Sequence, residues 1–345
     1  MRTRHLHSPA RPVLDRRLAL PFFTLPWLLA ALLGAAFLTP TALLAHPAAE
    51  AMAGAASKFL AALTPDQLAK ASFDFKADER FNWHFVPKER KGLTLKEMTA
   101  EQRVLALALL HTGLSEAGYS KATNIMSLES ILAEMEGPGR RFPRDPLLYH
   151  FLIFGQPDPK GTWSWRAEGH HFSSSFTVVK GQFLASTPSF MGTNPAEVRQ
   201  GARTGVRVLA GEEDRARELI HALDAGQRKT AILSNTAPAD IFTEAKRRVT
   251  ALAPVGVAAR QMTRAQRTLL QQVIEEYVNR VRPDLAKEDL KKIRKAGFDK
   301  ILFAWAGGME KGEGHYYRVQ GPTFLLEYDS TQNNKIGRAS CRERV

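Results

Sequence analysis

The stretch that most constrains the fold runs from Gly161 to Phe176. Side chains along a β-strand alternate between the two faces of a sheet. A strand here therefore places Arg166, Glu168 and His170 on one face. The other face receives Trp163, Trp165, Ala167 and His171. Because one face is mostly apolar and the other polar, we expect this segment to contribute both to a core and to a site.

A second stretch with the same alternation runs from His315 to Asp329. One face of a strand there carries His315, Tyr317 and Val319. The opposite face carries Tyr316, Arg318 and Gln320. Alternation of this kind is typical of antiparallel strands. The two stretches are far apart in the chain, so a site that uses both requires them to be neighbours in the sheet.

Helix-start signals occur before and between these stretches. A threonine followed three residues later by Gln or Glu forms a capping box, in which each side chain bonds to the other residue's backbone N–H. Such boxes begin at Thr64, Thr94, Thr99 and Thr263. We therefore expect an α+β fold in which an antiparallel sheet packs against several α-helices in a single domain. No internal repeat is visible.

Three further segments carry local signals. Aromatic residues alternate with polar ones from Phe73 to Phe85, which predicts a hairpin. Asn194, followed by proline, predicts the start of a helix that continues to Leu209. The three acidic residues 212–214 are expected in the solvated first turn of another helix, where they complement its dipole.

The N-terminus carries the features of an export signal. Five arginines precede an uncharged apolar run from Leu18 to Ala45. A basic region, an apolar region and a small residue at the cut define a secretory signal peptide. A retained anchor is the alternative, but three prolines interrupt the run. We therefore expect residues 1–45 to be cleaved and the protein to be exported, to the periplasm or the extracellular space.

The last residues, 335–345, differ in character from the rest of the chain. They resemble the conceptual translation of a common sequencing adapter. We expect this segment to be an artefact, disordered in the protein, with the real gene continuing beyond Asn334. Resequencing of the locus tests this expectation.

The basic charge of the chain is concentrated at its ends. Residues 1–45 carry a net charge of plus four and residues 335–345 plus three, so the total of plus thirteen leaves plus six on the body. The body has no stripe of Lys and Arg interleaved with aromatic residues, which argues against nucleic-acid binding. The only cysteine is Cys341. The body is therefore expected to lack disulfides, catalytic thiolates and Cys-bound zinc.

Three long motifs carry a family resemblance. They cover residues 80–87, 163–171 and 315–329. With them, residues 46–334 resemble the family called domain of unknown function 3500, which has no assigned reaction. The resemblance implies that members are often exported and that the pattern continues into a His-rich, Trp-containing stretch. That stretch is missing here, which supports C-terminal truncation.

The first functional hypothesis is a metal-dependent hydrolase or oxidoreductase of the cell envelope. Its metal ligands would be His170 or His171, His315 and histidines of the missing C-terminal stretch, with Glu168 or Asp329 as a further ligand or the general base. Glu168, His170 and Arg318 would be the catalytic residues. Imidazoles and a carboxylate bind zinc, copper or iron, and an open position on the metal activates water. The divalent metal would be one of these three.

The second hypothesis is a binding module for an anionic ligand. Arg166 and Arg318 would clamp the anion bidentately. Trp165, Tyr317 and His84 would complete the binding site. For His84 alone, an ordinary exposed or hydrogen-bonded histidine is the simpler interpretation.

The third hypothesis is a structural protein, in which the aromatic residues pack the core and the polar groups satisfy one another. The sequence leaves open whether the chain is an enzyme, and it does not predict an oligomeric state. Expected partners are small molecules, with no nucleic acid and no membrane contact beyond the signal segment. Convergence of His315 with His170 or His171 would favour the metal site, and convergence of Arg166 with Arg318 would favour the anion clamp.

Overall fold

The structure is a computed structural model that describes residues 45–331 and 337–343. Apart from Ala45, the predicted signal peptide lies outside the described residues. The chain from Ala45 onward forms one compact unit. Among the described helices, none combines the length and the apolar character needed to cross a bilayer.

Two halves of the chain contain the secondary structure. The first half comprises helices α2 (Pro47–Ala61), α3 (Pro65–Ala71), α4 (Ala100–Gly113) and α5 (Glu116–Glu136), short helices η2 (Asp78–Phe81) and η3 (Leu95–Glu97), and strands β1 (Ser72–Phe73), β2 (Leu93–Thr94), β3 (His150–Phe154), β4 (Trp163–Gly169), β5 (Phe172–Val179), β6 (Phe183–Ala185) and β7 (Ser189–Thr193). The second half comprises α6 (Ala210–Ala222), α7 (Ala225–Ala231), α8 (Arg264–Val278), α9 (Pro283–Gly297), η4 (Ala259–Gln261), η5 (Phe298–Lys300), β8 (Ile232–Ser234), β9 (Val257–Ala258), β10 (Leu302–Gly307), β11 (His315–Gln320), β12 (Phe324–Ser330) and β13 (Gly337–Glu343).

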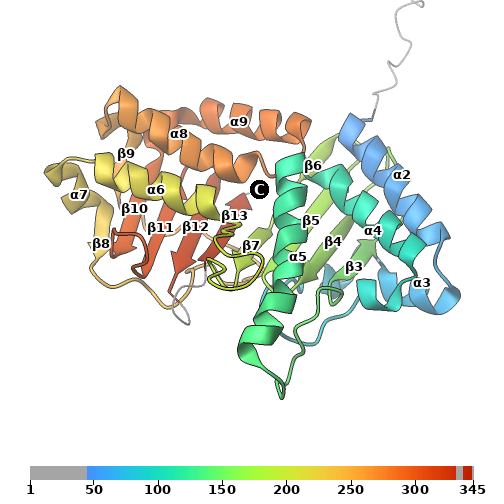
Figure 1. Ribbon diagram of the computed structural model, residues 1–345. Helices are drawn as coiled ribbons and strands as arrows, with labels where there is room; N and C mark the ends of the chain where they lie inside the picture. Colours follow the sequence, from blue (N-terminus) through green and yellow to red (C-terminus); the bar gives the residue numbers. More distant parts are fainter. Residues whose placement is uncertain (1–44, 332–336, 344–345) are drawn as a thin grey trace, which may run out of the picture. The chain divides into compact units, whose positions relative to one another are not determined.

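The strands form two mixed, mostly antiparallel sheets (Figure 1). The first has the order β1-β3-β4-β5-β7, and the second has the order β12-β11-β10-β8. Strand β13 pairs with β7 on one side and with β12 on the other, and so joins them. Among the described strands, only β1 with β3 and β8 with β10 pair in parallel. The predicted α+β class, with an antiparallel sheet packed against helices, is confirmed.

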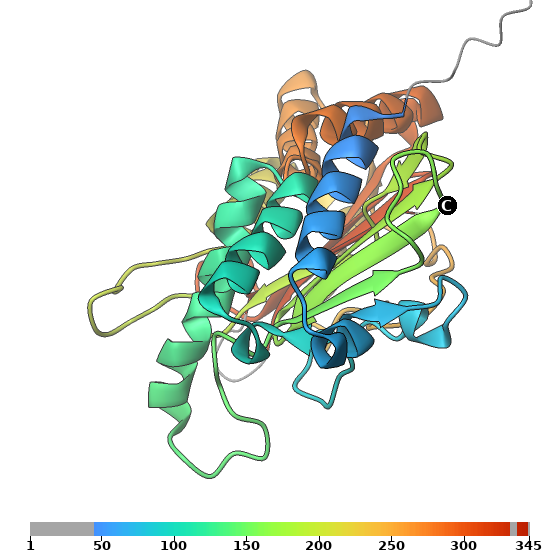
Figure 2. The same ribbon diagram turned by 90° about the vertical axis from the view of Figure 1, so that its right-hand side faces the viewer.

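The α-helices cover one face of the sheets (Figure 2). The apolar core between them contains Trp163 and Trp165, on the face of β4 that the alternation in the sequence predicted to be apolar. It also contains Tyr317, which the second hypothesis had placed in a binding site. The opposite face is covered by two long connections, residues 74–92 and 235–256. A three-layer arrangement results, in which both faces of the central strands are buried. This explains why all residues of β4 and β12 are buried.

The second half repeats the first, although no internal repeat was expected from the sequence. The order α2-α3-β1-β2-α4-α5-β3-β4-β5 recurs as α6-α7-β8-β9-α8-α9-β10-β11-β12. Strand registers also recur: Trp165 pairs with Phe176, and Tyr317 pairs with Tyr328. Both pairs are displaced by the same 152 residues (317 − 165 and 328 − 176). The two halves are therefore copies of one supersecondary unit.

A buried glutamine network is also repeated. Gln102 donates a hydrogen bond of 2.8 Å to the carbonyl of Ala62 after α2, and Gln266 donates one of 2.8 Å to the carbonyl of Ala222 at the end of α6. Each glutamine also caps the N-terminus of its own helix through a threonine. The glutamines that complete the two networks are Gln67 and Gln227. In both halves, therefore, one buried amide ties two helices together.

The two halves meet where the linkers of their helical hairpins pair with each other. Leu114, between α4 and α5, forms an antiparallel bridge with Val281, between α8 and α9. Ser115 N–H donates to the carbonyl of Arg280 at 3.0 Å, and Arg282 N–H donates to the carbonyl of Gly113 at 3.1 Å. Because equivalent linkers pair antiparallel, the halves are related by an approximate twofold axis at this point.

Two local predictions are wrong. Residues 73–85 do not form a hairpin, because only Ser72–Phe73 is a strand and the rest is η2 and irregular chain. Residues 194–209 are not helical. Val198 N–H instead bonds to the carbonyl of Val206, and Gly205 N–H bonds back to the carbonyl of Val198. These backbone hydrogen bonds within the loop outweigh its helix-start signals.

At the C-terminus, the disorder expected for residues 335–345 is not found in Gly337–Glu343, whose backbone forms β13. The backbone says nothing about where the sequence came from. The adapter origin therefore stays a prediction.

Two helical glycines provide a test of the contact between the halves. A Cβ added at Gly118 would lie 1.9 Å from the carbonyl oxygen of Arg280, whereas a Cβ at Gly54 would have no atom within 4 Å. We expect Gly118→Ala to lower the free energy of unfolding by about 2 kcal/mol or more through overpacking. Gly54→Ala should raise it by about 0.5–1 kcal/mol through helix propensity. Urea unfolding measures both free energies. Similar values for the two variants would contradict a close contact between the halves at Gly118.

Candidate functional site

Several predicted site residues come together on the outer face of β4, under the 74–92 connection. Arg166 pairs with the carboxylate of Glu79 at 2.8 Å and lies 3.2 Å from that of Glu168. Glu168 also accepts a hydrogen bond of 3.0 Å from the backbone N–H of His84, and Arg90 lies 3.8 Å from it. Burial raises the pKa of Glu168, against the opposing effect of the two arginines. This network fastens the connection to the sheet.

His84 has a local role in the same network. Its Nδ1 accepts hydrogen bonds from the backbone N–H groups of Phe85 and Val86 at 3.0 and 3.3 Å. Burial, assisted by the charges of Lys88 and Arg90, lowers the pKa of His84 to about 4. The ring is therefore neutral at pH 7 and caps its own turn.

Trp165 lies on the other face of β4, against the helices. Its ring stacks on Phe176 with 4.6 Å between the centroids. It is a core residue, separated by the sheet from Arg166 and Glu168.

The paired histidines lie in the turn between β4 and β5. Their rings stack at 3.8 Å. Nδ1 of His170 lies 2.6 Å from Oε1 of Glu129, and burial lowers the pKa of this imidazole, with Glu129 opposing the shift. His171 is buried and has a positive φ of 59°, and its N–H bonds to the carbonyl of Phe85. The His170 ring is thus held by α5, and the backbone of His171 is held by the 74–92 connection.

In the second half, Tyr317 and Arg318 point to opposite faces of β11. The Tyr317 hydroxyl lies 2.7 Å from that of Tyr277 and donates to the carbonyl of Glu212 at 2.7 Å. Arg318 donates to the carbonyl of Ala253 at 2.6 Å. Arg318 therefore holds the 235–256 connection as Arg166, its counterpart in the repeat, holds the 74–92 connection.

His315 begins β11 and is completely buried. Its ring stacks on Trp305 at 4.9 Å and on Tyr328 at 5.5 Å. Nδ1 lies 3.0 Å from the carbonyl oxygen of Glu313, whereas Nε2 has no hydrogen-bond partner among the described residues. Burial lowers the pKa of His315.

The strand order separates these groups. Between β5, next to the paired histidines, and β11, which carries His315, there are four steps, β5-β7-β13-β12-β11. Strands lie about 4.8 Å apart, so the distance is on the order of 19 Å. Arg166 on β4 is one strand farther from Arg318. Neither the expected shared metal centre nor the expected anion clamp is formed, and the described residues contain no group of three metal-binding side chains.

A cavity of about 760 Å³ between described residues was not predicted from the sequence, and we call it the end cleft. It lies where β7 and β12 end. Its walls come from α5, the loop after β7, the start of α6 and the loop between β10 and β11. Its charged lining residues are Glu134, Glu197, Glu213, Glu313, Arg199, Arg207 and Lys311. The loop after β7 was expected to be a helix, so the sequence offered no signal that these residues converge.

Glu213 connects the end cleft to a buried charge network. Its carboxylate accepts hydrogen bonds from Arg207 at 2.7 Å and from Arg217 at 2.8 Å. Its pKa is lowered by these arginines, although burial opposes the shift. The neighbouring Glu212 is completely buried and pairs with Arg280 at 2.7 Å. The expectation that residues 212–214 are solvated is therefore wrong for the first two.

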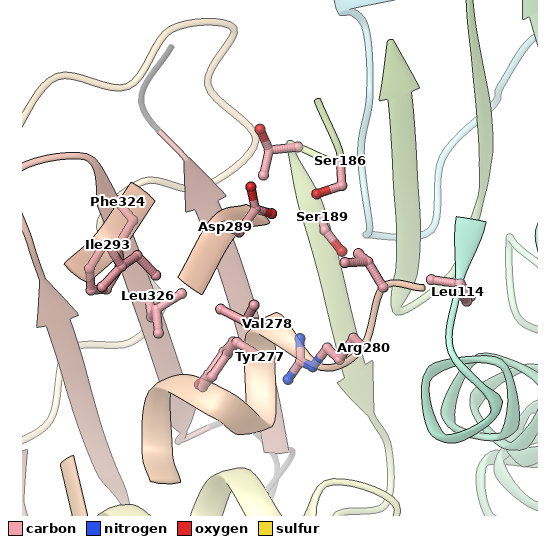
Figure 3. A pocket seen from close by; sticks show the side chains of 12 residues that line it. Leu114, Ser186, Ser189, Tyr277, Val278, Arg280, Asp289, Ile293, Phe324 and Leu326 are labelled. Carbon is pink, nitrogen blue, oxygen red and sulfur yellow. The ribbon is translucent and has the colours of Figure 1, made fainter. Parts of the chain in front are cut away.

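A second pocket lies at the opposite end of β7 and β12 (Figure 3). It has a volume of about 40 Å³ and is lined by the two hairpin linkers, including Leu114, and by α9. Asp289 lies at its edge, and burial raises the pKa of this carboxyl. A space of this size holds a few waters rather than a substrate.

The comparisons with known proteins give a family but no activity. The family model described as "Protein of unknown function (DUF3500)" matches residues 45–341. No curated protein gives a significant match. No solved structure gives a significant match.

Two partly buried histidines predict how stability depends on pH. Burial lowers the pKa values of His84 and His150 to about 4. Between pH 6.5 and 4 the unfolded chain binds protons that the folded chain does not, so the free energy of unfolding should fall as the pH falls. His150→Leu, which introduces the residue found at the equivalent position 302, should reduce this slope. Urea unfolding between pH 4 and 7 measures this slope. An unchanged slope in the variant would contradict the assignment of part of it to His150.

Proposed function

Because the chain belongs to the DUF3500 family, which is described only as being of unknown function, we propose a function from the geometry of the end cleft. The chain is an exported protein that binds a small charged molecule there. The observation that carries this proposal is a cavity of about 760 Å³, lined by charged side chains from both halves of the repeat.

The size and position of the end cleft support ligand binding. Pockets for small molecules have volumes of about 300–1,000 Å³ and occur preferentially between structural units. The end cleft has this size and lies between the two copies of the repeat. The small pocket of Figure 3 lies between the same copies but is too small for a substrate.

The charges in the end cleft indicate the class of ligand. Arg199 and Lys311 provide donors for a carboxylate or another anionic group, whereas the Arg207 guanidinium is held by Glu213 and Asp214. Glu134 and Glu313 provide acceptors for hydroxyl or amino groups on the rest of the molecule. A molecule that carries an anionic group together with hydrogen-bond donors, such as a hydroxy acid, an amino acid or a dipeptide, fits both.

The proposed export rests on residues 1–45. N-terminal sequencing of protein recovered outside the cytoplasm tests it, with a start near His46 as the expected result. The metal-dependent activity considered from the sequence stays a prediction, and metal analysis of untagged protein tests it. We locate the function in the end cleft because the histidines of that hypothesis lie apart.

Lys311 allows a direct test of ligand binding. Hydroxy acids, amino acids and dipeptides should be screened for compounds that raise the Tm, since a ligand of the folded state stabilises it. Lys311→Gln should weaken the binding of each such compound about tenfold or more, because a charge-assisted hydrogen bond contributes about 1.5–3 kcal/mol. Calorimetric titration measures the change in Kd.

Lys291→Gln is the matched control. Lys291 is exposed on α9 and does not line the end cleft, so this variant changes the net charge by the same amount. Its Kd should equal that of the unaltered protein. A screen without any stabilising compound, or equal effects of the two substitutions, would contradict the proposed binding site.

A further inference from the structure

The lining of the end cleft contains apolar residues as well as charged ones, and the apolar residues come from two neighbouring elements. These residues are Ile131 and Met135 on α5, and Pro195, Ala196 and Val198 in the loop after β7. From the second half of the repeat, α6 and the loop between β10 and β11 contribute the charged side chains of Glu213, Lys311 and Glu313. A ligand that fills the cleft therefore meets apolar surface at α5 and charged side chains at the elements of the second half.

The spacing of residues along α5 shows which side of the helix faces the cleft. Residues four apart lie on the same side of a helix, so Ser127, Ile131 and Met135 form one row. The hydroxyl of Ser127 accepts a hydrogen bond of 2.7 Å from Arg203, which belongs to the loop after β7. The amide oxygen of Asn124, one turn earlier, accepts a second bond of 2.8 Å from the same guanidinium. The loop is thus fastened against the side of α5 that carries the two apolar residues.

Met135 is unusually exposed for a large apolar side chain. Its exposed fraction is 62%, and among the large apolar side chains that the structure describes only Val104, at 67%, is more exposed. A single exposed apolar residue is common on protein surfaces. Met135 differs from Val104 because it lines a cavity together with other apolar residues. A flexible thioether in such a place adapts to the shape of an apolar group that packs on it.

Opposite charges lie next to each other in the same cavity. Nζ of Lys311 is 3.5 Å from Oε2 of Glu197, and the two side chains are 60% and 38% exposed. An ion pair this exposed is weak, so the groups of a ligand can reach both charges. An α-amino acid carries an ammonium and a carboxylate group on one carbon, and it therefore complements both members of this pair. A hydroxy acid complements only the lysine.

We propose that the end cleft binds an α-amino acid with a long apolar side chain. Lys311 binds the carboxylate of the ligand, and Glu197 binds its ammonium group. Ile131 and Met135 contact its side chain. This inference rests on the proposed function, because it uses the same cavity and the same lysine, and it narrows the class of ligand.

A homologous series of ligands tests the apolar contact in the unaltered protein. Alanine, 2-aminobutyrate, norvaline and norleucine differ only in the number of methylene groups. Because each buried methylene adds a nearly constant free energy of transfer, the Kd should fall about fourfold for each added carbon. Calorimetric titration measures the four Kd values. Values that do not depend on the length of the side chain overturn the proposal.

Met135→Gln tests where the side chain of the ligand lies. The fall in Kd should shrink to about twofold per carbon or less, because an amide replaces the apolar surface of the thioether. Val104→Gln is the matched control, since Val104 is similarly exposed but lies on α4 and does not line the end cleft. This control should keep the full dependence on length. The same dependence in both variants would show that the ligand does not pack on α5, contrary to the proposal.

Norleucine and hexanoate, which differ only in the α-ammonium group, test the contact with Glu197. Norleucine should bind about threefold more tightly, as expected for one exposed ion pair. Glu197→Gln should remove most of this preference, because the charged partner of the ammonium group is lost. Equal Kd values for the two compounds in the unaltered protein overturn the assignment of an amino acid as the ligand.

The proposed function and this inference fail in different ways. If hydroxy acids or dipeptides bind in a Lys311-dependent way while the amino-acid series shows no dependence on length, the end cleft remains the binding site and the ligand class inferred here is wrong. If no compound of any class binds, both claims are wrong.

Discussion

The backbone bridge between Leu114 and Val281 is the contact on which the rest of the structure depends. It pairs equivalent linkers of two copies of one unit, and two further backbone hydrogen bonds flank it. Gly118 allows this approach, since any larger side chain would collide with Arg280. Strand β13 also joins the halves, because it pairs with β7 on one side and with β12 on the other. Both pockets between the halves follow from this arrangement, at the two ends of β7 and β12.

The two copies have diverged in their cores. The first copy is packed with tryptophan and phenylalanine, and its polar networks fasten the 74–92 connection to the outer face of the sheet. The second copy has buried histidine, tyrosine and glutamate at matching positions on the helix side.

Much of the fold could be predicted from the sequence. Alternation placed Trp165 and Arg166 on the correct faces, and the capping boxes marked the starts of α4 and α8. The repeat had a visible signal, Met98-Thr99-x-x-Gln102-Arg103 against residues 262–267, but a similarity of six residues is easily passed over. The site could be predicted less well from the sequence. Which strands lie side by side depends on contacts distant in sequence, so the separation of His170 from His315 and the lining of the end cleft could not be derived from local patterns.

A reciprocal exchange at equivalent core positions tests most directly whether the fold requires the polar core of the second copy. Tyr328→Phe installs the ring present at Phe176, and Phe176→Tyr does the reverse. The free energy of unfolding, measured by urea titration, should be unchanged or higher for Tyr328→Phe, because a buried hydroxyl that has no partner among the described residues is removed. It should be lower for Phe176→Tyr by about 1–3 kcal/mol, because one is introduced. A loss of about 1 kcal/mol or more in Tyr328→Phe would show that the hydroxyl stabilises the fold and would contradict the account.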